Sequence, residues 1–543
     1  MKKNTDRPTK RRERREAARA QAVVEPPSKT DALRIVTIAQ AVVVVSIAAS
    51  CVLFSVAYVR LYLDDNCYHI PNAVRIAQHL NPYSVDSPVD SHWFPAGAET
   101  FAAIPILLSG SINASNLTGA WCVIGLLLLM YRFAGLWCAE AGGRWATLAC
   151  VATIPLLVGQ SIAFYIDIHL ALLVCLSLFL QCRALLQRRP DDVYWAVVVA
   201  LLVPSLKYSG LHTGGFLLAG CVYCLWRVGP SRRPSIGVLL ALAGVVTFTG
   251  GFYLRNWLWR GNPLYPFEEP RWIRSVLAVI GAPYEFDPAG ISSPRTEFPH
   301  PWVPLSWLKY DYRPDMTHDA FGTSFVIGAL CVVASLIVLR RRRGPARSAW
   351  IYLSVMTLLL AVLFPYGLRI PRYVLAVPVL AALGPAVLCG SLDGERGKQA
   401  TRWLRAGLLG WSALYATVNL FFPGEVVGSA AVAWSHMSPY DPLEREGKPY
   451  VERGHLRIGY TSGDNNLIAT LYDRYLTNTL IPLHYKDYPY NYWREAASPE
   501  EFLHQVENLH LDYIQIFDED YPGVDLLRQR FPEKVVPSVS PQG

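Results

Sequence analysis

Long apolar stretches alternate with short polar connections along most of this chain. The first, from about Ile35 to Val59, exceeds the roughly 20 residues that a helix needs to span a bilayer. It lacks a small-residue cleavage site and is too long for a signal peptide, so it is predicted to be an uncleaved first span. Ten further stretches follow, at 115–137, 144–160, 166–186, 192–206, 209–227, 235–253, 322–339, 349–366, 371–390 and 403–422. The pattern predicts a polytopic α-helical membrane protein of eleven transmembrane helices.

The polar segments divide the chain into three expected domains. Residues 1–33 form a basic tail, and residues 34–422 form the transmembrane domain with two long loops, 61–114 and 254–321. Residues 423–543 return to a mixed polar and apolar composition. This last part is expected to be a small folded domain outside the membrane.

Strands and helices are predicted to alternate in that last domain. Residues 456–460, 479–483 and 512–517 are short apolar runs typical of strands. Ser498-Pro-Glu-Glu501 is a capping box with proline at the first helical position, and it opens a helix to about Leu509. A second helix is expected over 524–531. This alternation predicts an α/β domain.

Composition and charge support a membrane protein and set its orientation. Charged residues make up 17% of the chain, against about 25% in average soluble domains. The net charge of the chain is +8. Its lysine and arginine residues cluster in alternate connections between the apolar stretches. The clusters are Arg183/Arg188/Arg189, Arg227/Arg232/Arg233, Arg340–Arg343 and Arg396/Lys398/Arg402/Arg405. Basic connections stay in the cytosol, so the N-terminus is predicted inside, and the long loops and the last domain outside. Nucleic acid is not an expected partner.

The cysteines do not predict a disulfide framework. Of eleven, only Cys67 lies in an expected outer loop, and the others fall in or beside apolar stretches. Cys221 and Cys224 form a CxxC pattern inside an apolar helix, for which packing is favoured over metal binding.

Two adjacent acids, Asp64 and Asp65, open the first outer loop. One alternative is helix capping by Asp65 or Asn66, because the next segment is amphipathic. Its apolar face consists of Ile70, Val74, Ala77 and Leu80, which predicts a short helix lying on the membrane surface. Capping needs only one acid, so the pair favours a general base, a metal ligand or both.

A third acid, Asp167, begins an apolar span at the same expected outer side, with His169 two residues on. An ionisable group at a membrane edge is a functional candidate, although capping of the span is an alternative. With Asp64 and Asp65, these two residues could bind a divalent cation. No other cofactor is predicted.

Cations also gather on the outer side, against the usual charge bias. They are Lys207, Arg255, Arg369 and Arg372. Each of these side chains could extend to lipid headgroups. Four such sites on one face instead favour a phosphorylated ligand, because the planar guanidinium of arginine donates two parallel hydrogen bonds to phosphate oxygens.

Acids that activate a hydroxyl and cations that hold a phosphate suit glycosyl transfer from a polyprenyl-phosphate sugar. A transporter or flippase of lipid-linked glycans is the alternative. It would be expected to carry charges near the middle of the bilayer, whereas these lie at its edge. A non-catalytic scaffold whose tail binds partners is a third hypothesis.

Four motifs resemble the GT-C membrane glycosyltransferases, in particular the family-39-like group with protein O-mannosyltransferases and lipid A aminoarabinose transferases. The motifs are DDNCYHIPNAVRIAQHLNPY with HWFPAGAE, FYIDIHLALL, LKYSGL with RNWLWRGNPLYPF, and IPRYVLAVPVL. The resemblance covers about residues 34–422 and, more weakly, the tail. The last domain does not resemble the modules of eukaryotic mannosyltransferases, which favours a bacterial enzyme of the inner or plasma membrane.

The resemblance implies roles for individual residues. Asp64 corresponds to the catalytic base, and Asp65 to an acid that helps to bind the acceptor or a metal. The donor phosphate is implied to lie near Lys207, Arg255 and Arg372, with Arg369 beside them. Remaining polar residues of the motifs are candidates for contacts with the acceptor or a metal: Tyr68, His69, His92, Glu99, Asp167 and His169. The expected partners are a polyprenyl-phosphate sugar donor, a lipid, glycan or protein acceptor and the bilayer, and the expected reaction inverts the anomeric centre.

Overall fold

A computed structural model shows the fold of most of the chain. It describes residues 29–57, 68–84, 93–161, 164–229, 233–265, 321–340, 344–362, 371–392, 394–417, 454–461, 477–483, 498–516 and 523–536.

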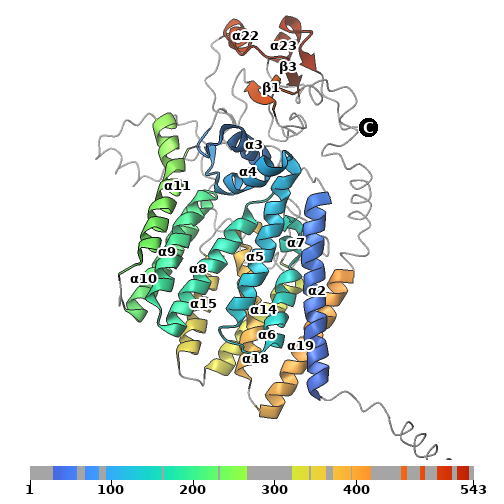
Figure 1. The fold of residues 1–543 in the computed structure, drawn as a ribbon, viewed down its shortest axis with the longest axis vertical. Coiled ribbons are helices and arrows are strands. Elements are labelled where there is room, and N and C mark those ends of the chain that lie inside the picture. The colour runs from blue at the N-terminus through green and yellow to red at the C-terminus, as the bar shows by residue number, and fades with distance from the viewer. Residues whose placement is uncertain are drawn as a thin grey trace, which may run out of the picture.

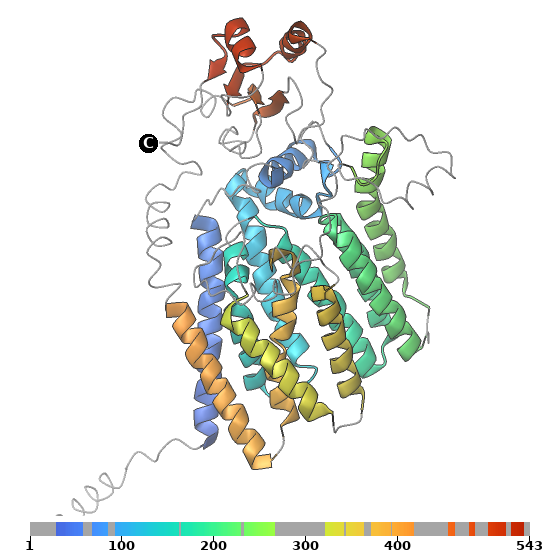
Figure 2. The same ribbon diagram turned by 180° about the vertical axis from the view of Figure 1, so that it is seen from behind.

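Most of the described residues form a bundle of long helices that run roughly side by side (Figures 1 and 2). From the N-terminus these helices are α2 (Lys29–Ala57), α5 (Leu117–Ala134), α6 (Ala141–Ala152), α7 (Pro155–Ser161), α8 (Asp167–Gln187), α9 (Pro190–Leu202), α10 (Ser209–Val228), α11 (Ile236–Arg260), α14 (Gly322–Leu339), α15 (Pro345–Val362), α17 (Ala376–Ala381), α18 (Gly384–Ser391) and α19 (Gly394–Ala416). Each falls within or close to a stretch that the hydropathy pattern predicts as a span.

Six helices among the described residues are long and apolar enough to cross a membrane, and a pair bent by 70°, α6 with α7, passes the same test as one span. The chain is therefore an α-helical integral membrane protein. The predicted total of eleven spans remains a prediction, because several helices of the bundle, such as α9, are shorter than a full span.

Local signals explain where the long helices begin and end. The Ser235 hydroxyl accepts a hydrogen bond from the Val238 N–H at 3.3 Å and so caps the start of α11. Gly261, at a φ of 66°, ends the same helix in the left-handed conformation that glycine adopts without strain. Arg188 ends α8, and Pro190 opens α9 two residues later. Such abrupt reversals place the basic connections together at one end of the bundle, where α2 begins (Figure 1).

The opposite end of the bundle, called the site end below, is covered by two short helices, α3 (Ile70–His79) and α4 (Gly97–Ser109), followed by the 3₁₀ turn η3 (Ile112–Asn116). The expectation that α3 lies with its apolar face on the membrane is wrong. Ile70, Val74 and Ala77 are buried within the protein, and Leu80 lies exposed past the end of the helix. The neighbouring helix α4 provides apolar surface for α3 to pack against, so the face that looked membrane-facing is part of the core.

A four-stranded parallel sheet lies beyond α3, with strand order β2-β1-β3-β4. The strands are β1 (Arg457–Thr461), β2 (Thr479–Leu483), β3 (Tyr513–Ile516) and β4 (Val535–Val536), and the helices are α22 (Pro499–Asn508) and α23 (Val524–Arg530). Ile458 is opposite Leu480 on one side and Tyr513 on the other. The Ser498 hydroxyl accepts a hydrogen bond from the Glu501 N–H at 3.2 Å, as the capping box predicts. The predicted strands and helices of the tail are confirmed.

The two helices cover one face of this sheet, where Phe502, Val506 and Leu527 pack with Ile514. The residues of the other face, such as Tyr460, belong to the same buried cluster as those of the bundle. The Gln78 side chain of α3 donates to the Asn478 carbonyl at 3.1 Å, so the sheet contacts the first loop directly.

Candidate functional site

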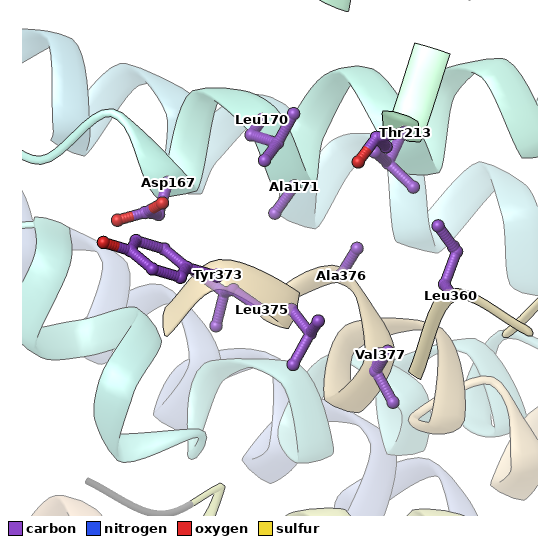
Figure 3. A pocket seen from close by; sticks show the side chains of 11 residues that line it. Asp167, Leu170, Ala171, Thr213, Leu360, Tyr373, Leu375, Ala376 and Val377 are labelled. Atoms are coloured by element: carbon purple, nitrogen blue, oxygen red, sulfur yellow. The ribbon is translucent and has the colours of Figure 1, made fainter. Parts of the chain in front are cut away.

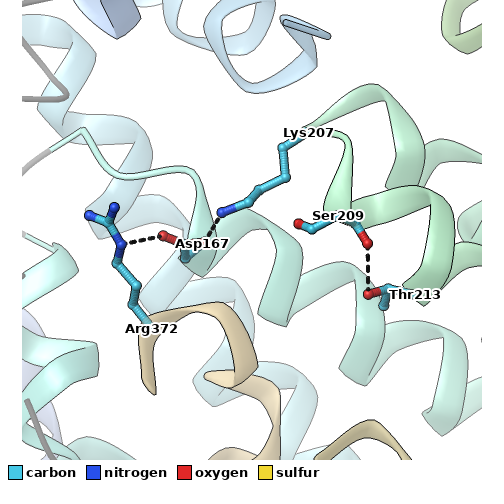
Figure 4. Close-up of polar contacts among 5 residues, drawn as sticks. All are labelled: Asp167, Lys207, Ser209, Thr213 and Arg372. Carbon is cyan, nitrogen blue, oxygen red and sulfur yellow. Dashed lines mark hydrogen bonds and ion pairs between the residues drawn. The ribbon is translucent and has the colours of Figure 1, made fainter. Parts of the chain in front are cut away.

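The candidate site is built around Asp167, the first residue of α8 at the site end of the bundle. The N-cap position of α8 is Ile166, so Asp167 lies in the first turn of the helix and not at its cap. Instead, the carboxylate accepts from the Lys207 ammonium group, with Nζ 2.5 Å from Oδ1 (Figure 4). Lys207 comes from the turn between η4 (Val203–Ser205) and α10, which brings it across to α8. Only 2% of the Asp167 side chain is exposed, and an acid buried this far needs such a partner.

Arg372 approaches Asp167 from the other side. It lies in the 3₁₀ turn η5 (Pro371–Val374), and its Nε is 3.8 Å from Oδ2 of the carboxylate. The terminal nitrogens of the guanidinium point away from Asp167 (Figure 4). Two aromatic rings hold the cations: Lys207 Nζ is 3.9 Å from the centre of the Tyr373 ring, and the Arg372 guanidinium is 5.0 Å from that of Tyr165. Two cations and one anion leave this cluster with a formal charge of +1.

An apolar groove begins at the same carboxylate. The space between its lining atoms is about 330 Å³ when the solvent at its open end is counted. Its walls come from α8, α10, α15 and the 373–377 segment, and are lined by Asp167, Leu170, Ala171, Val174, Thr213, Leu360, Tyr373, Val374, Leu375, Ala376 and Val377. Figure 3 shows Asp167 and the Tyr373 hydroxyl at one end and Leu360 and Val377 at the other. The Thr213 hydroxyl is turned back onto the Ser209 carbonyl at 3.2 Å, so it adds little polarity to the wall (Figure 4).

Arg255 is not among the cations that contact Asp167. Its guanidinium donates to the Trp93 carbonyl at 2.5 Å and to the Asn256 side chain at 2.8 Å, and the residue is buried. Asn256 in turn donates to the Tyr208 hydroxyl at 2.6 Å, and that hydroxyl donates to the Tyr265 carbonyl at 2.5 Å. Burial raises the pKa of the Tyr208 phenol, which keeps it neutral and able to donate. These contacts tie the first loop, the turn that carries Lys207 and the end of α11 together.

A second buried pair lies in the first loop. Nδ1 of His69 is 2.6 Å from Oε1 of Glu99, and each side chain is 2% exposed. The Tyr68 ring lies beside that of His69, with ring centres 4.0 Å apart and the planes tilted by 44°. His169 is buried in the first turn of α8, where its ring meets that of Phe164 in an edge-to-face contact, and the Phe164 ring also contacts His69.

Several predicted site residues cannot be placed. Asp64, Asp65, His92 and Arg369 lie outside the described residues, so their roles remain predictions. Within the part of the chain that the structure describes, no three His, Cys, Asp or Glu side chains are grouped as a metal site would require. Cys221 and Cys224 are both buried, in agreement with the interpretation that they contribute to helix packing.

Sequence reasoning missed several residues that shape the site. The most important are Tyr165, Tyr208, Tyr373, Trp93 and Asn256. Each stands within two residues of a predicted site residue, and four of the five are aromatic, so an aromatic residue close to a charged or histidine residue in the motifs was the signal for those four. Their contribution depends on contacts between segments, which the spacing along the chain does not show.

Fold and site together define an α-helical membrane protein with a cationic cluster at the mouth of an apolar groove. Among solved structures, the chain is similar to ArnT from Cupriavidus metallidurans, in a crystal structure bound to undecaprenyl phosphate and in one of the apo state. Each is 14% identical, with a TM-score of 0.49 over 92% of this chain and 89% of that chain. It is also similar to the arabinosyltransferase EmbB from Mycobacterium smegmatis, at 15% identity and a TM-score of 0.37, over 73% of this chain and 40% of that one. No protein-family model and no curated protein sequence matches the chain.

Proposed function

We propose that this protein is a membrane glycosyltransferase that takes its sugar from a polyprenyl-phosphate donor. The observation that carries the proposal is the position of Lys207 and Arg372 at the mouth of the apolar groove. A lipid phosphate needs an apolar channel for its chain that ends at a cationic site for its headgroup. The groove, lined mainly by aliphatic side chains, and the +1 cluster beside Asp167 provide both within one contiguous surface.

The chemistry follows from the leaving group. The oxygen of an acceptor hydroxyl attacks the anomeric carbon of the sugar, and the bond from that carbon to the phosphate oxygen breaks. The electron pair leaves with the phosphate, which gains negative charge that Lys207 and Arg372 stabilise. The proton of the hydroxyl passes to a carboxylate, for which Asp64 is the proposed base and Asp65 its partner in binding the acceptor. Attack opposite to the phosphate inverts the anomeric centre.

Asp167 is proposed to hold the two cations in place before the donor arrives. An isolated lysine and arginine at the edge of an apolar groove would repel one another and turn toward water. The carboxylate between them offsets this repulsion, and the start of α8 favours its negative charge. His69 and Glu99 are proposed to fix the start of α3, which follows the acid motif by five residues.

The orientation proposed for the reaction places it on the outer face of the membrane. Basic connections gather at the end of the bundle opposite to the site, which the positive-inside bias assigns to the cytosol. A cysteine introduced at Arg341 should therefore be shielded from an impermeant thiol reagent in intact spheroplasts, and one at Gln505 of α22 should be labelled. The reverse pattern would place the site in the cytosol.

The activity itself is tested with purified protein in proteoliposomes and a radiolabelled polyprenyl-phosphate sugar. A transferase releases polyprenyl phosphate and forms a labelled glycoside when an envelope lipid extract is supplied as the acceptor. A flippase moves the intact donor between leaflets without breaking the bond, and a scaffold does neither. Translocation without release of the sugar would overturn the proposal.

A further inference from the structure

The apolar groove ends part of the way along the helices that form its walls. Away from Asp167, the last lining residues are Val174 on α8, Thr213 on α10 and Leu360 on α15. All three helices continue from there toward the end of the bundle that carries the basic connections. The groove is therefore closed by side chains, and not by the ends of its walls.

Three large apolar side chains lie one helical turn beyond the last lining residues, which is a step of about 5.4 Å. They are Leu178 on α8, Leu217 on α10 and Met356 on α15, which runs in the opposite direction to the other two helices. All three are buried and belong to the core of the bundle. These three residues, called the floor below, fill the space between the walls at this level.

A polar network lies directly beyond the floor and ties the walls together. Nε2 of Gln181 donates to the Ser177 hydroxyl at 3.0 Å and to the Leu217 carbonyl at 3.2 Å. Oε1 of the same side chain accepts a hydrogen bond from the Tyr352 hydroxyl. Polar side chains inside a span are costly unless they are paired, and two of these bonds join α8 to α10 and α15. The network therefore fixes the three walls where the groove ends.

Helices α10 and α15 approach closely at the level of this network. Gly220 of α10 has no side chain, and a Cβ atom there would collide with the Tyr352 hydroxyl and the Gln181 amide oxygen. The same Cβ would lie 2.8 Å from the terminal methyl of Met356, so the floor rests against Gly220. Tyr223 stacks on Tyr352 with ring centres 5.3 Å apart and planes inclined by 8°. The floor is thus supported from beneath, and an apolar chain cannot displace it downward without breaking these contacts.

We propose that the floor is a stop that sets how much of the lipid chain the protein encloses. This inference rests on the proposed function, because the chain of the lipid phosphate is the occupant of the groove. The part of the chain next to the phosphate lies in the groove, and the rest of a long chain leaves sideways into the bilayer. Leu358, two residues before Leu360 on α15, is 63% exposed on the surface that faces lipid. The protein therefore selects the first units of the chain and is indifferent to its length beyond the stop.

The path of the chain is tested with photoreactive n-alkyl phosphates bound to the protein in phosphatidylcholine nanodiscs. Each probe carries one diazirine, placed one methylene further from the phosphate than in the probe before it, and labelled residues are identified by mass spectrometry. In the wild type, successive probes should label the walls as far as Val174 and Leu360. Probes with the diazirine further out should label the surrounding lipid instead of Tyr352.

Two variants open the floor from different walls. Met356→Ala removes the side chain that rests against Gly220, so the far probes should now label Tyr352, one turn deeper than in the wild type. Leu217→Ala should give the same shift, and it keeps the test decisive if Met356→Ala does not fold. Met130→Ala is the matched control, because it removes an equally buried methionine from α5, outside the groove, and should keep the wild-type pattern.

Labelling of Tyr352 in the wild type would show that the groove continues inward and would overturn the proposal. A wild-type pattern in the folded floor variants would show that these side chains do not end the groove, and would overturn it as well. Labelling does not require transfer of a sugar. A protein that labels as expected but releases no sugar from the donor would therefore keep the stop and refute the proposed function, whereas no labelling of the walls would refute both.

Discussion

Lys207 has two separable roles, as a partner of Asp167 and as a proposed ligand of the donor phosphate. In Lys207→Met the side chain keeps most of its length but loses its charge, and Asp167 is left buried without its closest partner. Removing one member of a buried ion pair costs about 3–5 kcal/mol. Arg372 stays 3.8 Å from the carboxylate and offsets part of this, so we expect a loss of about 3 kcal/mol in the free energy of unfolding.

The double variant Lys207→Met/Asp167→Asn separates the two roles. With neither charge present, no buried carboxylate lacks its partner, and only the longer 3.8 Å contact of Arg372 is lost, so most of the lost stability should return. The donor phosphate still lacks a charge-assisted contact worth about 1.5–3 kcal/mol. Its affinity should therefore stay about 10- to 150-fold below that of the wild type in both variants.

Stability is measured by denaturation in mixed micelles, and affinity by binding of a radiolabelled polyprenyl phosphate. Lys398→Met is the matched control, because Lys398 pairs with Glu395 at 3.2 Å on the exposed start of α19. That pair is exposed on both sides, so its loss should cost less than about 1 kcal/mol and leave lipid binding unchanged.

Two results would refute this reasoning. Equal stability of Lys207→Met and the wild type would mean that the pair with Asp167 does not form in the membrane. Recovery of donor affinity in the double variant would mean that Lys207 does not contact the phosphate, and that its loss acted only through the unfolding of the site.

Asp64→Asn should lower turnover by about 10²–10⁴-fold while donor binding is retained, whereas Asp65→Asn should cost less; near-normal turnover in both variants would remove this pair from the mechanism. Arg372→Ala should weaken donor binding by about 10- to 150-fold, with partial recovery in Arg372→Lys, and unchanged affinity would identify the arginine as a lipid anchor. Arg255→Ala should instead lower the free energy of unfolding by about 1.5–3 kcal/mol, because the buried Trp93 carbonyl loses its charged donor and keeps only Asn256, at 3.1 Å. A selective loss of donor affinity would restore the predicted role of Arg255 at the phosphate. Ala376→Phe should fill the groove and weaken the binding of a long-chain polyprenyl phosphate but not that of a soluble sugar phosphate; equal binding of the long chain would place the lipid elsewhere.

The membrane architecture follows from the order of residues alone. A stretch such as 322–339 is strongly apolar and carries no charged residue, and inside a bilayer its backbone groups find partners only within a helix. Helix ends are also local, because Ser235, Gly261 and Pro190 act through their nearest neighbours. The capping box at Ser498 and the apolar runs of the tail likewise need no distant contact to specify a helix and strands. For these elements, pattern and structure agree closely.

The site depended on contacts that no spacing reveals. Asp167, Lys207 and Arg372 stand far apart along the chain, and only the packing of α8 with the turns before α10 and α17 brings them together. Arg255 belongs to the same expected side, yet the carbonyl of Trp93 reaches its guanidinium and gives it a structural partner. The apolar face of α3 looks suited to lipid when taken alone, but α4 covers it and presents its own apolar face outward. Hydropathy decides that such a face must be buried, and only the tertiary structure decides whether protein or lipid buries it.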